Sequence, residues 1–235
     1  MTITKNKVII AICALLAVVA VAVTSVFATV AYLTSSAAVS NVFTVGNVGI
    51  TLTESKVNTD GTQTDGGATQ VDTNTYHLVP NKSYTKDPRI TVAAGSEDSY
   101  LFVLVRNDLE KIEDKTDPTN RPTIAQQLEE LGWAKYTKAS TGWVYVWVGQ
   151  GNVPAGDASK TDGAFTATAI TATAGDYYLF NEFSIASDAD VSTYGAAKIT
   201  ITAVAIQDTG FEGNLDAAWQ AVVDTYPYIH TGTTP

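Results

Sequence analysis

Apolar and polar positions alternate with a period of two along most of the chain. Residues 41–54 (NVFTVGNVGITLTE) show this alternation, and Gly46 and Gly49 within it indicate a bulge or a close backbone approach. The nearly all-apolar run 100–106 predicts a central strand covered on both faces. Further strands are expected wherever alternating or continuous apolar runs lie between turn residues, at 76–79, 89–94, 133–138, 143–148, 165–173, 177–186 and 197–207.

Two short helices are expected between these strands. Thr123 is a candidate N-cap, and apolar residues follow it at helical spacing until Gly132. Asn214 is expected to cap a second helix, in which Ala218, Trp219 and Val222 share one face. Residues 55–75 and 149–163 are expected to be loops, and 226–235 a loose tail. About eight strands with long connections predict a mainly β fold, a jelly-roll or Greek-key β-sandwich over residues 32–225.

The N-terminal segment has a different pattern. Lys5 and Lys7 precede an apolar run over 8–23, and small residues follow at 28–31. These are the three parts of a secretory signal peptide, so we expect a signal helix over 1–31 that a signal peptidase removes between Ala31 and Tyr32. The alternative is an uncleaved membrane anchor, because the run 8–33 is almost long enough to span a bilayer. Membrane contact is expected only through this segment.

The composition limits the classes of partner that the chain can bind. The 235 residues carry a formal net charge of −10, with a pI near 4.5, which argues against nucleic-acid binding. The only cysteine, Cys13, lies in the predicted signal peptide, so the mature chain is expected to be secreted without thiols or disulfides. Stability must then come from the hydrophobic core.

Motifs for catalysis or metal binding are absent from the sequence. His77 and His230 lie in unrelated contexts, and neither HExxH nor GxSxG occurs. The acid pairs 97/98, 129/130 and 188/190 fit turns and helix surfaces, and Asp60 and Asp65 fit turns better than a calcium loop. Trp133, Trp143 and Trp147 could stack sugars, although core packing of a sandwich is the favoured explanation. No catalytic residue, metal or cofactor is expected.

Two stretches resemble a known family. The first, 28–54, carries a small-residue site followed by an N-x-F-x-x-G pattern, on Ala31, Tyr32, Leu33, Thr34, Asn41, Phe43, Gly46, Val48, Ile50, Leu52 and Glu54. The second is 77–105, which follows a different pattern of the same family, L-x-P-G-x-x-x-x-K-x-[PV]-x-[VI]. It departs from that pattern at Asn81, where glycine is usual. Both resemble proteins with the SipW-dependent type of signal peptide from Gram-positive bacteria, which include the TasA biofilm-fibre proteins and camelysin. The resemblance implies a jelly-roll fold and head-to-tail polymers in which the mature N-terminal segment is donated as a strand.

The residues offer a physical basis for such donation. Residues 32–43 are uncharged and β-compatible, and an extended segment can add to an open sheet edge. We therefore expect a non-enzymatic extracellular fibre subunit, with Tyr32, Leu33, Val39, Val42 and Phe43 in the donated strand. An edge strand folded back on its own domain satisfies the same backbone groups. The rival functions are a camelysin-like surface metallopeptidase and a module that binds glycans or host proteins through loop 55–75.

Overall fold

The computed structural model describes residues 34–38, 41–44, 47–154, 159, 170–211 and 213–231. These belong to one compact unit, 33–235. The fold is mainly β, with 34% strand and 14% helix, and its sheets are antiparallel. The predicted signal peptide, 1–31, and the predicted strand residues 165–169 lie outside the described residues.

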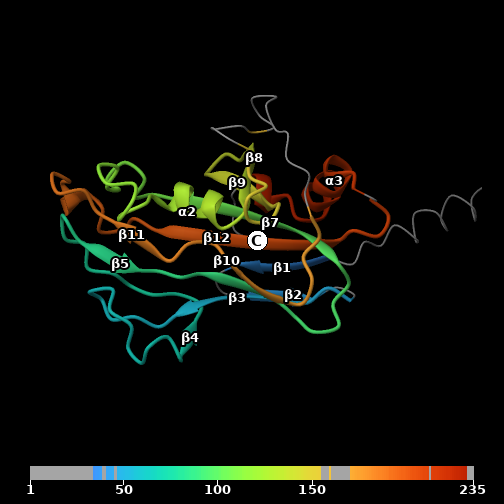
Figure 1. The fold of residues 1–235 in the computed structure, drawn as a ribbon, viewed down its shortest axis with the longest axis horizontal. Helices are drawn as coiled ribbons and strands as arrows, with labels where there is room; N and C mark the ends of the chain where they lie inside the picture. The colour runs from blue at the N-terminus through green and yellow to red at the C-terminus, as the bar shows by residue number, and fades with distance from the viewer. Residues whose placement is uncertain are drawn as a thin grey trace, which may run out of the picture. The chain divides into compact units, whose positions relative to one another are not determined.

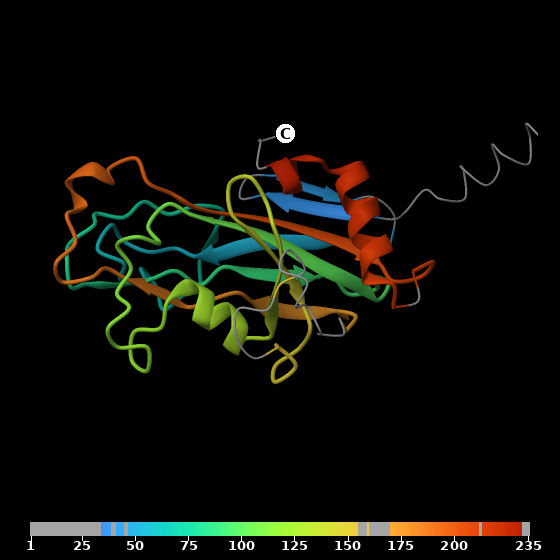
Figure 2. The ribbon, with the colours of Figure 1, turned by 90° about the horizontal axis from the view of Figure 1, so that it is seen from above.

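Six strands form the larger sheet, in the order β2-β1-β12-β7-β9-β8. Figure 2 shows the N-terminal strands, in blue, beside the orange β12. The bounds are Thr34–Ala38 (β1), Asn41–Thr44 (β2), Ser99–Asn107 (β7), Trp133–Lys138 (β8), Trp143–Trp147 (β9) and Ile199–Gln207 (β12).

Two smaller sheets complete the β structure. A four-stranded sheet has the order β10-β6-β3-β4, and a two-stranded sheet pairs β11 with β5. The bounds are Ile50–Ser55 (β3), Gln70–Val71 (β4), Ser83–Thr85 (β5), Arg89–Val92 (β6), Gly175–Tyr178 (β10) and Glu182–Ser184 (β11). The turn at residues 93–98 therefore connects strands of different sheets, since β6 and β7 do not pair.

Strand β7 is central and covered on both faces, as its apolar sequence predicts (Figure 1). Leu101, Val103 and Val105 pack in a core shared with Ile50 and Ile90 of the four-stranded sheet. The alternate residues of β7 face the opposite side of the sheet. There the centre of the Phe102 ring lies 5.0 Å from that of Trp219, which belongs to the helix Leu215–Thr225. Burial on both faces explains why period-two alternation is lost in this strand.

Both predicted helices are confirmed. Helix α2 (Ile124–Glu130) begins at Thr123, which forms a capping box with Gln126, and Gly132 follows its end with a φ of 95°. Helix α3 (Leu215–Thr225) is capped by Asn214 and buries Ala218, Trp219 and Val222, as expected. The described residues also contain a 3-10 turn, η1 (Val191–Thr193), and a short helix, α4 (Tyr228–Thr231).

The strand predicted at 76–79 is absent and the one predicted over 177–186 is interrupted, and in both places side chains bind the backbone groups. The segment 76–79 forms no strand: the Tyr84 hydroxyl donates to the His77 carbonyl and accepts from the Val79 amide. The segment 177–186 is divided between β10 and β11. The break lies where the Gln127 side chain accepts from the amides of Asn181 and Glu182.

Loop 55–75 and the tail are more ordered than the sequence suggests. Most of the loop is exposed, but it buries Val57 and contains β4, which pairs with the end of β3. The tail was expected to be loose from residue 226, yet 228–231 form α4 and Ile229 is fully buried. An apolar side chain anchors this part of the tail. Asn81, the departure from the family pattern, has a φ of 59°, which glycine and asparagine adopt most readily.

Candidate functional site

The N-terminal strands form one edge of the larger sheet. β1 runs antiparallel to β12, from the pair Thr34–Ile206 to the pair Ala38–Thr202. β2 pairs with the outer side of β1, and Ala38 lies opposite Asn41, so the chain reverses over two residues. The fold-back alternative for this segment is therefore the arrangement adopted within a single chain.

This edge differs from the outer strands β8, β4 and β10 of the two larger sheets. β8 carries Lys135 and Lys138, whose ammonium groups lie 4.1 and 4.9 Å from the centre of the Trp143 ring, and it also contains a register irregularity. β4 has only two residues, and β10 carries the charged Asp176. Lysines, bulges and short length all hinder edge-to-edge pairing. By contrast, residues 32–44 contain no charged side chain.

A cleft of about 860 Å³ adjoins the start of β12. Its two walls are residues 73–78 and 191–200, and Lys86 and Phe183 also line it. Much of the lining is apolar or aromatic, and this volume falls in the range of clefts that hold ligands or peptide segments. The apolar and aromatic lining residues are Tyr76, Leu78, Leu109, Phe183, Val191, Tyr194, Ala196, Ala197 and Ile199.

A buried ion pair borders the cleft. The Lys86 ammonium lies 2.5 Å from Oε2 of Glu54, and the two residues are only 7% and 3% exposed. Among the residues that the structure describes, the other carboxylate oxygen of Glu54 has no hydrogen-bond partner. Burying both charges is costly, so the pair depends on its mutual attraction.

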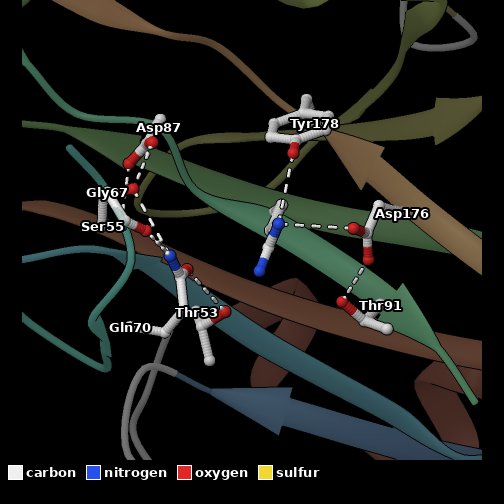
Figure 3. A network of polar contacts seen from close by, with 9 residues as sticks. Thr53, Ser55, Gly67, Gln70, Asp87, Thr91, Asp176 and Tyr178 are labelled. Carbon is white, nitrogen blue, oxygen red and sulfur yellow. Dashed lines mark hydrogen bonds and ion pairs between the residues drawn. The ribbon is translucent and has the colours of Figure 1, made fainter.

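The neighbouring residues hold this pair in place. Asp87 accepts hydrogen bonds from the amide and hydroxyl of Ser55, at 2.8 and 2.6 Å, which joins the end of β3 to the segment after β5. Figure 3 shows Asp87 and Ser55 with Gln70 and Thr53, beside a second polar group that includes Thr91, Asp176 and Tyr178. Glu54 and Lys86 are the chain neighbours of Ser55 and Asp87. The hydrogen bonds between Ser55 and Asp87 therefore hold Glu54 and Lys86 next to each other.

Tyr76 forms an aromatic part of the cleft wall. Burial, and then the negative charges of Glu54 and Asp87, raise the pKa of its hydroxyl well above the ordinary value. Tyr76 therefore stays protonated, and its hydroxyl donates to the Thr85 carbonyl at 3.0 Å. Its ring meets those of Tyr84 and Phe183 edge-on. The cleft thus offers a rigid aromatic wall next to a fixed pair of charges.

The structure places two of the predicted assembly residues, Val42 and Phe43, in β2. Tyr32, Leu33 and Val39 lie outside the described residues, as does Ala31 at the expected cleavage point. The sequence analysis did not single out Lys86, Tyr76 or the start of β12 as site residues. The sequence signal for the ion pair was Lys86 itself, between two strands. Its partner Glu54 lies 32 residues earlier in the chain, so the sequence did not link the two.

The other candidate residues have structural contacts. Asp60 and Asp65 accept hydrogen bonds from the amides and hydroxyls of Thr62 and Thr69 within turns. Trp133 is fully buried, and its indole donates to the Tyr178 carbonyl. The acid pairs lie in the 93–98 turn, at the end of α2 and before η1, where Asp190 caps the 3-10 turn.

The two histidines belong to different parts of the fold. His77 lies at the cleft, and His230 lies in α4. Over the described ranges, no three His, Cys, Asp or Glu side chains are grouped as a metal site. Among the helices that the structure describes, none is long and apolar enough to cross a bilayer.

Comparison of the chain with protein-family models, curated proteins and solved structures found no match. The family resemblance carried by 28–54 and 77–105 therefore stays a prediction.

Proposed function

We propose that the chain is a secreted structural subunit that polymerises outside the cell, by donating its N-terminal strand to the sheet edge of a second copy. The observation that carries this proposal is the pairing of β1 with β12 at an edge made entirely of uncharged residues. A strand that closes this edge within one chain can make the same backbone bonds to another chain.

The composition of β1 supports an exchangeable strand. Its sequence, TSSAA, contains only small side chains, so little apolar area ties it to its own domain. Thr34 is also only three residues beyond the expected cleavage point, so signal removal frees the segment. The outer strands β8, β4 and β10 carry features that disfavour pairing, which favours assembly at the edge formed by β1 and β2.

Finer parts of the prediction belong to the same proposal. A jelly-roll or Greek-key topology is favoured by antiparallel neighbours that are distant in sequence, such as β12 with β7 and β10 with β6. Growth into a filament requires a head-to-tail contact that does not close on itself. The peptidase and glycan-binding functions have no specific observation in their favour.

The proposal is tested by truncation. Chains beginning at Tyr32 and at Asn41 are purified, and their assembly is followed by electron microscopy and size-exclusion chromatography. We expect filaments from the longer chain and folded monomers from the shorter one, with circular dichroism to verify folding. A chain lacking only residues 232–235 serves as the control and should still assemble. Filaments from the chain that begins at Asn41 would contradict the proposal.

A further inference from the structure

β1 covers only part of the available edge of β12. It pairs with residues 202–206, while β12 begins at Ile199. No described strand pairs with residues 199–201 on that side. The cleft lies at this uncovered part, because Ile199 and Thr200 line it.

The uncovered backbone points toward the β1 side of the sheet. The Lys198 carbonyl accepts from the Asp108 amide, so residue 198 faces β7. Backbone groups of successive residues in an antiparallel strand point to opposite sides. The amides and carbonyls of Ile199 and Ile201 therefore face the same side as β1, where a strand could bind them.

The observed register predicts which residues would reach the cleft if β1 continued straight. Thr34 lies opposite Ile206 and Ala38 opposite Thr202. Continued in the same register, Asn41 falls opposite Ile199, and Val42 and Phe43 reach the cleft beyond it. In the folded-back form, β2 instead returns along β1, and Val42 pairs with Ala37.

A straight strand cannot form within one chain. The Asn47 carbonyl accepts from the Glu97 amide, and Ser99 pairs with Gln207, so Asn47 is held at the Gln207 end of β12. The path along β12 from Gln207 to Ile199 is about 26 Å at ~3.3 Å per residue. In that register Asn41 would lie opposite Ile199, and the link from Asn41 to Asn47 spans at most about 22 Å at ~3.6 Å per residue. The chain must therefore fold back, and only another copy can supply a straight strand.

We propose that the cleft and the uncovered edge of β12 receive the straightened 34–44 segment of a second copy, which seats Val42 and Phe43 in the cleft. The hairpin of β1 and β2 is the closed state of the same segment, occupying most of the acceptor edge until exchange. This inference rests on the proposed function, and it adds the acceptor surface and the change in strand shape.

Cross-linking between copies tests the register. The chain beginning at Tyr32 has no cysteine, so two single-cysteine variants, Val42→Cys and Lys198→Cys, can be mixed under assembly conditions and oxidised. Directly opposed residues lie close enough for a disulfide with small backbone adjustment. We expect a disulfide-linked heterodimer on non-reducing gels. Mixing Val42→Cys with Lys111→Cys, an exposed lysine outside the cleft lining, should give none.

A second variant tests the opening of the hairpin. The double variant Ala37→Cys, Val42→Cys should form a disulfide within one chain, because these residues are partners in the closed state. We expect the oxidised form to remain monomeric and the reduced form to assemble. Filaments without the 42–198 cross-link, or filaments from the oxidised hairpin, would overturn this inference alone. If the parent chain forms no assembly, the proposed function fails, and this inference fails with it.

Discussion

The buried ion pair beside the cleft allows a quantitative test of the structure. Changing Lys86 to Met removes the cation that lies 2.5 Å from the Glu54 carboxylate. Glu54 is only 3% exposed, and one of its oxygens already lacks a hydrogen-bond partner, so the remaining charge has no compensation. Breaking a buried pair in this way costs about 3–5 kcal/mol. For a domain of this size, that loss lowers Tm by roughly 6–20 °C.

The double variant Glu54→Met, Lys86→Met distinguishes the ion pair from simple packing. Replacing both charges with apolar side chains of similar volume is often neutral or stabilising, so the double variant should be more stable than Lys86→Met alone. Urea unfolding of the parent, both single variants and the double variant gives the coupling energy. The exposed pair Arg106–Asp108 supplies the control, since Arg106→Met should cost no more than about 1 kcal/mol.

Two results would refute this reasoning. The first is a loss below about 1 kcal/mol for Lys86→Met, which would mean that water reaches Glu54. The second is additivity of the two single variants, because residues that interact directly must show coupling.

Three further predictions concern stability. Gly142→Ala should destabilise the domain by about 2 kcal/mol or more in thermal unfolding, because the added Cβ collides with the Val105 carbonyl oxygen in β7, whereas Gly195→Ala, with open space around it, should change stability by less than about 1 kcal/mol. Tyr136→Phe should cost about 1.5–3 kcal/mol, because it removes the hydroxyl that donates to Asp216 in α3; unchanged urea unfolding would contradict this contact. Burial raises the pKa of Glu113 above its usual 4.5, so the stability contributed by its bound proton is complete below the unfolded pKa and lost as pH rises through the folded pKa. Glu113→Gln should therefore gain stability relative to the parent as pH rises from the unfolded pKa through the folded pKa in urea unfolding, and a constant difference would contradict the burial.

Local features of the sequence determined most of the elements. Alternating apolar residues predicted β3 and β6, in which buried positions alternate with more exposed ones, and apolar runs between turn residues predicted β8, β9 and β12. Thr123 and Asn214 predicted the starts of α2 and α3, because an N-cap side chain binds amides only two or three residues away. The uncharged segment behind the candidate cleavage site was expected to be β-compatible, and β1 and β2 lie there.

Tertiary structure decided how those elements pair. A period of two reveals which side of a strand is buried but does not identify its neighbours, so nothing in the sequence showed that the successive strands β6 and β7 lie in different sheets. Whether 76–79 and 177–186 form continuous strands depended on hydrogen bonds with the side chains of Tyr84 and Gln127. The alternation of apolar residues does not reveal such bonds. β1 leaves Ile199 uncovered, since its pairing with β12 ends at Thr202 and the amide of Glu97 binds the carbonyl of Asn47 near the opposite end of β12. Long-range contacts of this kind set both the fold and the candidate site, since they depend on residues brought together only by folding.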